Sequence, residues 1–179
     1  MQYGSTPLEN AIRAFRDGSV NMLLPLTRSF AEYNLTQIKG YLDSLEDTPE
    51  RKNKKAEVYG HATATGNQEL NADNYLNAIH YYTTAINANP SDAALYLLRS
   101  FSYARLFNGQ NALKDAQRCV RLRPNWAKAY EREAAAWELL RDYRMALQAL
   151  SNALRLQPGE AQIEKRIRYM KEEIEWNQD

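Results

Sequence analysis

The sequence predicts an all-α protein built from a repeated pair of antiparallel helices. The first observation is a period, because Pro90, Pro124 and Pro158 are spaced 34 residues apart. The second is that apolar residues inside each period recur in steps of three and four, which is typical of amphipathic helices. The third is a set of packing columns that keep the same period: Ala78, Ala112 and Ala146; Ile79, Leu113 and Leu147; Ala85, Cys119 and Ala153; Ile86, Val120 and Leu154.

The N-terminal segment, residues 1–46, carries its own helix signals. Thr6 is a good N-cap and Pro7 suits a first helical position, so a helix is expected to start there. A second short helix is expected over residues 34–45, whose apolar residues fall on one side. The sequence Thr6-Pro7-Leu8 and its surroundings resemble one ankyrin repeat. Residues 1–46 are therefore interpreted as an ankyrin-like terminal repeat with an extra helix.

Residues 47–58 are interpreted as a charged linker that runs into the first helix of the array, because this stretch contains Pro49 and many charged residues. Three units are then expected at residues 59–92, 93–126 and 127–160. Each holds two helices, and the break within the middle unit is placed at Asn108-Gly109, a typical turn sequence.

Two features place the ends of these helices. Each of the three periodic prolines is expected to end a second helix, because proline disfavours helix at the residue before it. Ser91-Asp92 is a plausible cap for the helix that follows. The last segment, residues 161–179, has one apolar stripe and an otherwise charged surface, as a terminal capping helix requires.

These units resemble the tetratricopeptide repeat family, whose pattern has a small residue late in the first helix, alanine in the second and proline at the end. The matching positions are Gly66, Ala78, Tyr82, Ala85 and Pro90; Ser100, Tyr103, Ala112, Ala116, Cys119 and Pro124; and Ala134, Trp137, Ala146, Leu150, Ala153 and Pro158. The resemblance implies a right-handed superhelix with a concave groove lined mainly by the first helices. Together with the ankyrin-like start, it makes the chain similar to plant ankyrin-tetratricopeptide proteins.

Chaperone-binding members of the family hold the carboxylate end of a peptide with Lys and Asn in the first repeat, Asn in the second, and Lys and Arg in the third. By this resemblance the peptide-binding residues are Asn67, Lys128 and Arg132, with Arg105 replacing a lysine that flanks the groove. The resemblance suggests acidic chaperone C-terminal tails as one class of partner. Without it, Lys128 and Arg132 would read as an ordinary solvated pair of basic residues on a helix.

Two clamp positions depart from the pattern. Thr63 stands where the first lysine is expected, and Leu98 stands where the second-repeat asparagine is expected. Losing one charged and one neutral donor would cost about 2–4 kcal/mol, which moves a micromolar binder toward the millimolar range. The groove is thus expected to bind a chaperone tail weakly, to bind another peptide, or to bind none.

Two functions follow from these observations. The first is a protein-interaction adaptor that binds a peptide in the groove. The second is a structural or self-assembly module, which Leu98 and Phe101 favour because they make part of the groove apolar. The oligomeric state is left open, and a cytoplasmic location is expected.

Other classes of function have little support in the sequence. Lys and Arg number 23 against 22 Asp and Glu, and this balance argues against a nucleic-acid or anionic-membrane binder. No apolar run approaches the roughly 18–20 residues that span a bilayer. One cysteine and two distant histidines make no familiar metal site. No nucleophile with a base, carboxylate pair or phosphate loop emerges, so neither an enzyme nor a cofactor is expected.

Overall fold

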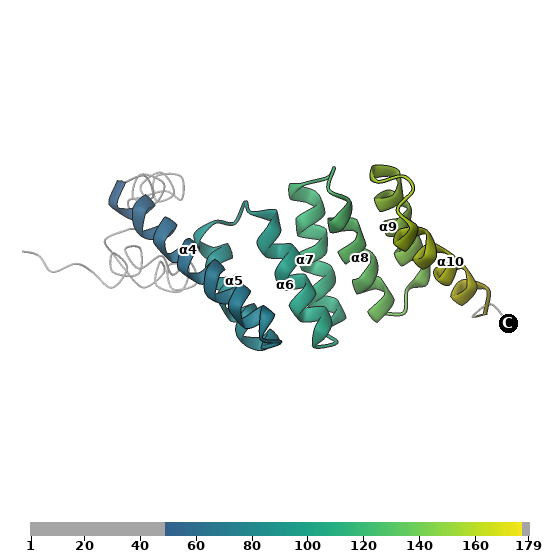
Figure 1. The fold of residues 1–179 in the computed structure, drawn as a ribbon, viewed down its shortest axis with the longest axis horizontal. Coiled ribbons are helices and arrows are strands. Elements are labelled where there is room, and N and C mark those ends of the chain that lie inside the picture. The colour runs from purple at the N-terminus through teal and green to yellow at the C-terminus, as the bar shows by residue number, and fades with distance from the viewer. Residues whose placement is uncertain (1–48, 177–179) are drawn as a thin grey trace, which may run out of the picture. The chain divides into compact units, whose positions relative to one another are not determined.

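The computed structural model describes residues 49–176, and they form seven α-helices and no strand (Figure 1). The helices are α4 (Pro49–Asn71), α5 (Tyr75–Ala88), α6 (Ala93–Arg105), α7 (Gly109–Leu122), α8 (Ala127–Leu139), α9 (Tyr143–Leu156) and α10 (Ala161–Trp176). The predicted all-α array of helix pairs with a final helix is confirmed. The chain divides into two compact units, residues 1–54 and 55–179. The ankyrin-like repeat predicted for residues 1–46 lies outside the described residues.

Helix α4 begins earlier than the sequence pattern indicated. Residues 47–58 were expected to be a charged linker that leads into a helix, but the chain is helical from Pro49 onward. Proline suits a first turn because its missing N–H would have no partner there, and the acidic Glu50 complements the helix dipole. The Lys, Glu and Ala residues that follow are good helix formers, so charge here reflects solvent exposure rather than a break.

Two of the four packing columns identified by the period are fully buried. The Ala78, Ala112 and Ala146 column has no exposed surface, and neither does the column of Ala85, Cys119 and Ala153. Small side chains at these points let the second helix of each pair approach its neighbours closely. Consecutive helices from α5 to α10 pack on one another, and α6 also contacts α8. The array therefore brings first helices of adjacent pairs side by side.

The turns inside the helix pairs share one backbone conformation. Asp73, Phe107 and Arg141, again 34 residues apart, all adopt left-handed φ angles of 59°, 56° and 60°. The prediction that Asn108-Gly109 forms the turn of the middle unit is therefore inexact. Asn108 is the N-cap of α7, with its side chain accepting a hydrogen bond from the Asn111 amide.

Gly109 is needed for packing rather than for turning. A Cβ at this position would lie 2.9 Å from Cδ2 of Leu140, on the next helix pair. Glycine therefore lets the start of α7 approach the end of α8 closely. The Asn-Gly pair marks the right place in the sequence, but each residue contributes there for a different reason.

The periodic prolines end the second helices as predicted. Helices α5, α7 and α9 stop two residues before them, and the residues that precede the prolines have extended φ angles of −139°, −138° and −132°. This is the conformation that proline imposes on its predecessor. Asp92 caps α6 by accepting a hydrogen bond from the Ala94 amide at 2.9 Å, which confirms the predicted cap.

Helix α10 closes the end of the array. Ile163 and Met170 are fully buried and share a core cluster with Leu150 and Ala153 of α9. The apolar stripe of the last segment thus covers the face that α9 would otherwise leave open, as expected of a capping helix. No helix within residues 49–176 is long and apolar enough to cross a membrane.

Candidate functional site

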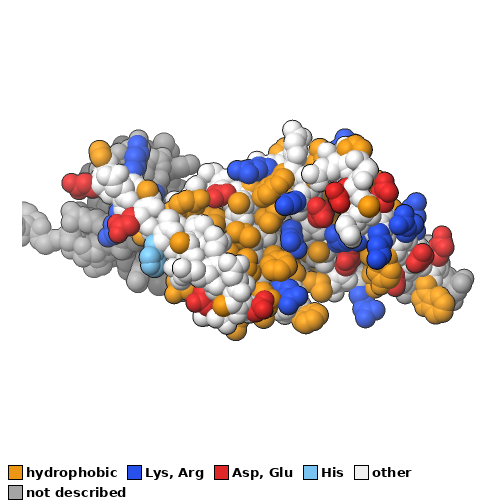
Figure 2. Space-filling view, in the orientation of Figure 1, with side chains coloured by type: hydrophobic (Ala, Val, Ile, Leu, Met, Phe, Trp, Pro, Cys, Tyr) orange, Lys and Arg blue, Asp and Glu red, His pale blue; other side chains and the backbone are white. Residues whose placement is uncertain are grey.

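The six predicted site residues all lie on the first helices of the three pairs. Asn67 is on α4, Leu98, Phe101 and Arg105 are on α6, and Lys128 and Arg132 are on α8. Because α6 contacts α8, the residues of these two helices can act together. The face seen in Figure 2 carries hydrophobic side chains over the middle of the array, between α4 and α10, with Lys and Arg side chains along their border.

Four side chains of α5, α6 and α8 form a continuous row, in which two aromatic rings lie between two arginines. The guanidinium carbon of Arg132 lies 4.6 Å from the centre of the Phe101 ring. The Phe101 ring meets Tyr75 edge-on, with ring centres 6.3 Å apart. Arg105 lies over the Tyr75 ring at 5.1 Å and donates a 2.9 Å hydrogen bond to its hydroxyl. We call Arg105, Tyr75, Phe101 and Arg132 the arginine–aromatic row.

Tyr75 is the member of this row that sequence reasoning missed. It is the first residue of α5, and its hydroxyl donates to Asp73 in the preceding turn while accepting from Arg105. The contact with Arg105 spans 30 residues of sequence. A tyrosine at the start of a second helix carries no local signal for such a role, since only the packed array brings it to the end of α6.

Arg132 is a partly buried cation without a carboxylate partner among residues 49–176. Burial lowers its pKa; the charge of Glu131 opposes that change, and the charge of Arg166 adds to it. Arg166 comes from α10 and pairs with Glu138 at 2.7 Å. A guanidinium remains protonated under all ordinary conditions, so Arg132 is a permanent positive charge that is partly shielded from solvent.

Lys128 lies one helical turn before Arg132 and is exposed to solvent. Residues four apart on a helix lie on the same side, so both cations of α8 point from one face. The structure thus places Arg105 and Arg132 against the aromatic rings, with Lys128 one turn away from Arg132 on α8.

The α4 part of the site is uncharged. Asn67 accepts a 2.8 Å hydrogen bond from the hydroxyl of Tyr82, a fully buried residue whose pKa burial raises to about 12. This bond fixes the amide oxygen of Asn67 and leaves the amide NH2 as the group that can donate to a ligand. The buried hydroxyl oxygen of Thr63 has no hydrogen-bond partner within the described part of the chain. Leu98 is partly buried and packs against the core cluster that includes Tyr82.

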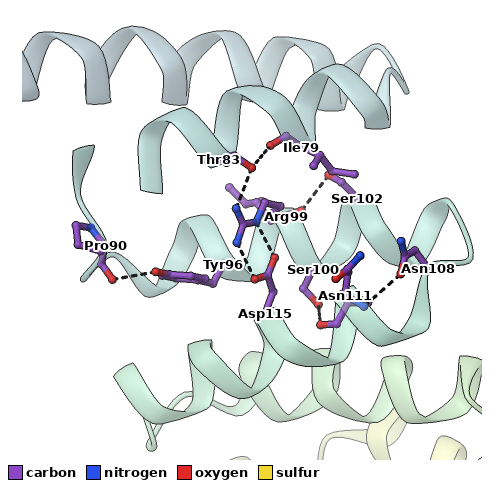
Figure 3. Close-up of polar contacts among 12 residues, drawn as sticks. Ile79, Thr83, Pro90, Tyr96, Arg99, Ser100, Ser102, Asn108, Asn111 and Asp115 are labelled. Carbon is purple, nitrogen blue, oxygen red and sulfur yellow. Dashed lines mark hydrogen bonds and ion pairs between the residues drawn. The ribbon is translucent and has the colours of Figure 1, made fainter. Parts of the chain in front are cut away.

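The site rests on a buried ionic network that sequence reasoning also missed (Figure 3). Arg99 of α6 donates from Nε and Nη2 to the two oxygens of Asp115 on α7, at 2.7 and 2.8 Å. Its Nη1 donates to Thr83 of α5 at 2.8 Å. One guanidinium therefore ties three helices together. The available signal was a charged residue on an apolar stripe, since Asp115 falls between the buried Ala112 and Ala116 positions.

No family model matches the chain, but comparison with known proteins finds several relatives. Over 109 residues the chain is 32% identical to the Hsp70-Hsp90 organizing protein of Triticum aestivum, covering 61% of this chain and 19% of that protein. Over 113 residues it is 40% identical to Hsp70-Hsp90 organizing protein 1 of Glycine max, covering 63% and 20%. A U-box domain-containing protein of Oryza sativa subsp. japonica is 25% identical over 138 residues. The chain spans about a fifth of the length of these relatives.

Solved structures give the fold directly. The first TPR domain of human RPAP3 superposes with a TM-score of 0.64 and 25% identity, over 68% of this chain and 95% of that one. The second TPR domain of human RPAP3, in complex with the HSP70 peptide SGPTIEEVD, gives 0.63 and 26%, over 65% and 98%. The first TPR of Spaghetti, bound to the HSP90 peptide SRMEEVD, gives 0.64 and 25%, over 66% and 94%. The described helix array therefore has the fold of a tetratricopeptide repeat domain.

Proposed function

We propose that this domain is a protein-interaction adaptor, which binds a short acidic peptide of a partner on the surface formed by the arginine–aromatic row and Lys128. The observation that carries the proposal is Arg132. Its guanidinium is partly buried against Phe101 and has no carboxylate partner among residues 49–176. A charge-assisted hydrogen bond from such a group to a carboxylate is stronger than a neutral one.

The similarity to peptide-bound domains supports this proposal. Two of the similar structures hold chaperone peptides, and both peptides end in Glu-Glu-Val-Asp. An acidic chaperone tail is therefore one candidate partner for Arg105, Lys128 and Arg132. Thr63 and Leu98 supply neither a cation nor an amide donor at their positions. We accordingly expect a chaperone tail to bind about 2–4 kcal/mol more weakly than it would to a complete donor set.

Titration of the peptide SRMEEVD tests the proposal. Arg132→Gln should weaken binding at least tenfold, or about 1.4 kcal/mol, because it removes the fixed charge and keeps a polar side chain. Arg155→Gln, at an exposed position near the end of α9, is the matched control and should bind like the wild type. Circular dichroism should show both variants folded. Equal binding by the wild type and Arg132→Gln would contradict the proposal, and so would an absence of binding at millimolar peptide.

A structural or self-assembly role is the second candidate, and exposed apolar side chains favour it. Phe107 is 86% exposed and Trp176 is 82% exposed. Such side chains gain free energy when a second molecule covers them. A mass that rises with concentration, and that Phe107→Ser returns to the monomer value, would support this role over the adaptor. A monomer at all concentrations would exclude it.

We further propose that residues 1–46 form an ankyrin-like repeat with an extra helix, as Thr6-Pro7-Leu8 indicates. Hydrogen exchange that shows two protected helices in this segment would support the assignment, and uniform rapid exchange would contradict it.

We also propose that the protein is located in the cytoplasm. The support for this location is Cys119, a free and fully buried thiol of the kind found in reducing compartments.

A further inference from the structure

The two ends of the candidate surface differ in charge. The end formed by α6 and α8 carries three cations, Arg105, Lys128 and Arg132. The end formed by α4 carries Thr63 and Asn67, which are neutral. A ligand with one negative group therefore has a single favourable orientation, with that group on α8.

The α4 end is poorly equipped to receive a carboxylate. The amide oxygen of Asn67 is already engaged by Tyr82, which leaves one neutral NH2 group as donor. The Thr63 oxygen is buried, and the adjoining Leu98 is an apolar side chain packed on the core. Moving a carboxylate from water to such a place costs more free energy than one or two neutral hydrogen bonds return.

The α8 end has the opposite character. Burial lowers the pKa of Arg132, and the charges of Glu131 and Arg166 act on it in opposite directions. Because Arg166 is paired with Glu138, Arg132 remains a cation without a carboxylate partner among residues 49–176. The 2.7 Å pair with Glu138 holds Arg166 in place. The guanidinium carbon of Arg132 lies over the Phe101 ring, 4.6 Å from its centre, and the N–H groups of a guanidinium lie in its own plane. That geometry suits two parallel hydrogen bonds to the two oxygens of one carboxylate.

The ring that covers Arg132 also defines what should lie beside the carboxylate. Phe101 and Tyr75 stand in edge-on contact between Arg132 and Arg105. Aromatic surface next to the cations favours a bulky apolar side chain adjacent to the acidic residue. A negative group and an apolar group are thus accommodated side by side.

From this asymmetry we infer that the surface recognises an internal segment of a partner, in which a Glu or Asp side chain binds Arg132 and a neighbouring bulky apolar side chain packs on Phe101. A free C-terminal carboxylate is not required. The inference rests on the proposed function, and it names the class of peptide that the same surface takes.

Three forms of one peptide test the inference by titration: SRMEEVD with a free C-terminus, the same peptide amidated, and SRMQQVN with a free C-terminus. Amidation removes only the terminal charge and should change the dissociation constant less than threefold. Replacing both Glu residues by Gln and the Asp by Asn removes all three side-chain carboxylates and should weaken binding at least tenfold. Tenfold or greater loss on amidation would overturn the inference while leaving the proposed function intact. Failure of all three peptides to bind would overturn both.

A gain-of-function variant provides an independent test. Thr63→Lys adds a cation at the neutral end, so it should tighten binding of the free-ended peptide about tenfold and leave the amidated peptide unchanged. Gln148→Lys, at an exposed position on α9, adds the same charge elsewhere and is the matched control. If Thr63→Lys tightened both peptide forms equally, or if Gln148→Lys had the same effect, the asymmetry between the two ends would be refuted.

Discussion

Breaking the pair between Arg99 and Asp115 should destabilise the domain strongly, because both side chains are buried. Their side-chain exposures are 15% and 6%. Arg99→Met keeps the apolar volume of the side chain but leaves the Asp115 carboxylate without its two hydrogen bonds and without a counter-charge. The change also removes the hydrogen bond to Thr83, so α5, α6 and α7 are no longer joined by the hydrogen bonds of one side chain.

The size of the effect follows from this burial. Removing one partner of a buried pair typically costs about 3–5 kcal/mol. At about 4 °C of melting temperature per kcal/mol for a domain of this size, Arg99→Met should melt about 12–20 °C lower. Asp115→Leu should cost less, because Arg99 is the more exposed partner and can turn toward water. The double variant should recover most of the loss, since it leaves no buried charge unpaired.

Thermal and urea unfolding followed by circular dichroism would measure all three variants. Arg166→Met is the matched control, because it breaks a pair whose side chains are 30% and 29% exposed. A partly exposed pair of this kind is worth about 0–1 kcal/mol. If Arg99→Met cost no more than this control, or if the double variant were no more stable than Arg99→Met, the buried pair would not have the stabilising role given to it here.

Three further predictions concern packing, titration and backbone strain. Gly66→Ala places a Cβ 2.8 Å from Cε1 of the fully buried Tyr82, so urea unfolding should show a net loss of about 1–2 kcal/mol; higher stability would contradict this close contact. Burial raises the pKa of Cys119 to about 11. The unfolded thiol ionises near pH 8.5. Below pH ~8.5 the thiol is protonated in both states, and as the pH rises toward 11 only the unfolded thiol ionises, which lowers the free energy of unfolding. The urea midpoint should fall less between pH 8 and pH 10 for Cys119→Ala than for the wild type. An equal fall in the two proteins would contradict this assignment. Phe107→Gly should raise the free energy of unfolding by about 0.5–1 kcal/mol, because φ is 56° there; a loss in urea unfolding would show that the ring contributes contacts.

Helix ends were predictable from the sequence because they depend on local chemistry. Pro90 fixes the extended conformation of Asn89, and Asp92 caps the next helix with its own side chain. The 34-residue period then extends the same local signals through the array. The start of α4 was misplaced because charge is common both in linkers and on exposed helices. Pro49 and Glu50 were the better guide, since both suit the first turn of a helix.

The polar contacts could not be predicted because they join residues far apart in sequence. Arg99 meets Asp115 across 16 residues, and Arg105 meets Tyr75 across 30. No spacing rule within one helix anticipates either pair. The family resemblance named Arg132 but could not show that it lies on Phe101 and carries no carboxylate partner among residues 49–176. Those environments depend on how α6 packs against its neighbours.

Backbone amide chemical shifts during titration with SRMEEVD would show whether acidic peptides bind at α6 and α8. The largest shift changes should fall around Phe101 and Arg132, with smaller ones near Lys128. The second helices α7 and α9 should change little. Saturable changes centred on α7 and α9, or no change at millimolar peptide, would contradict binding at α6 and α8.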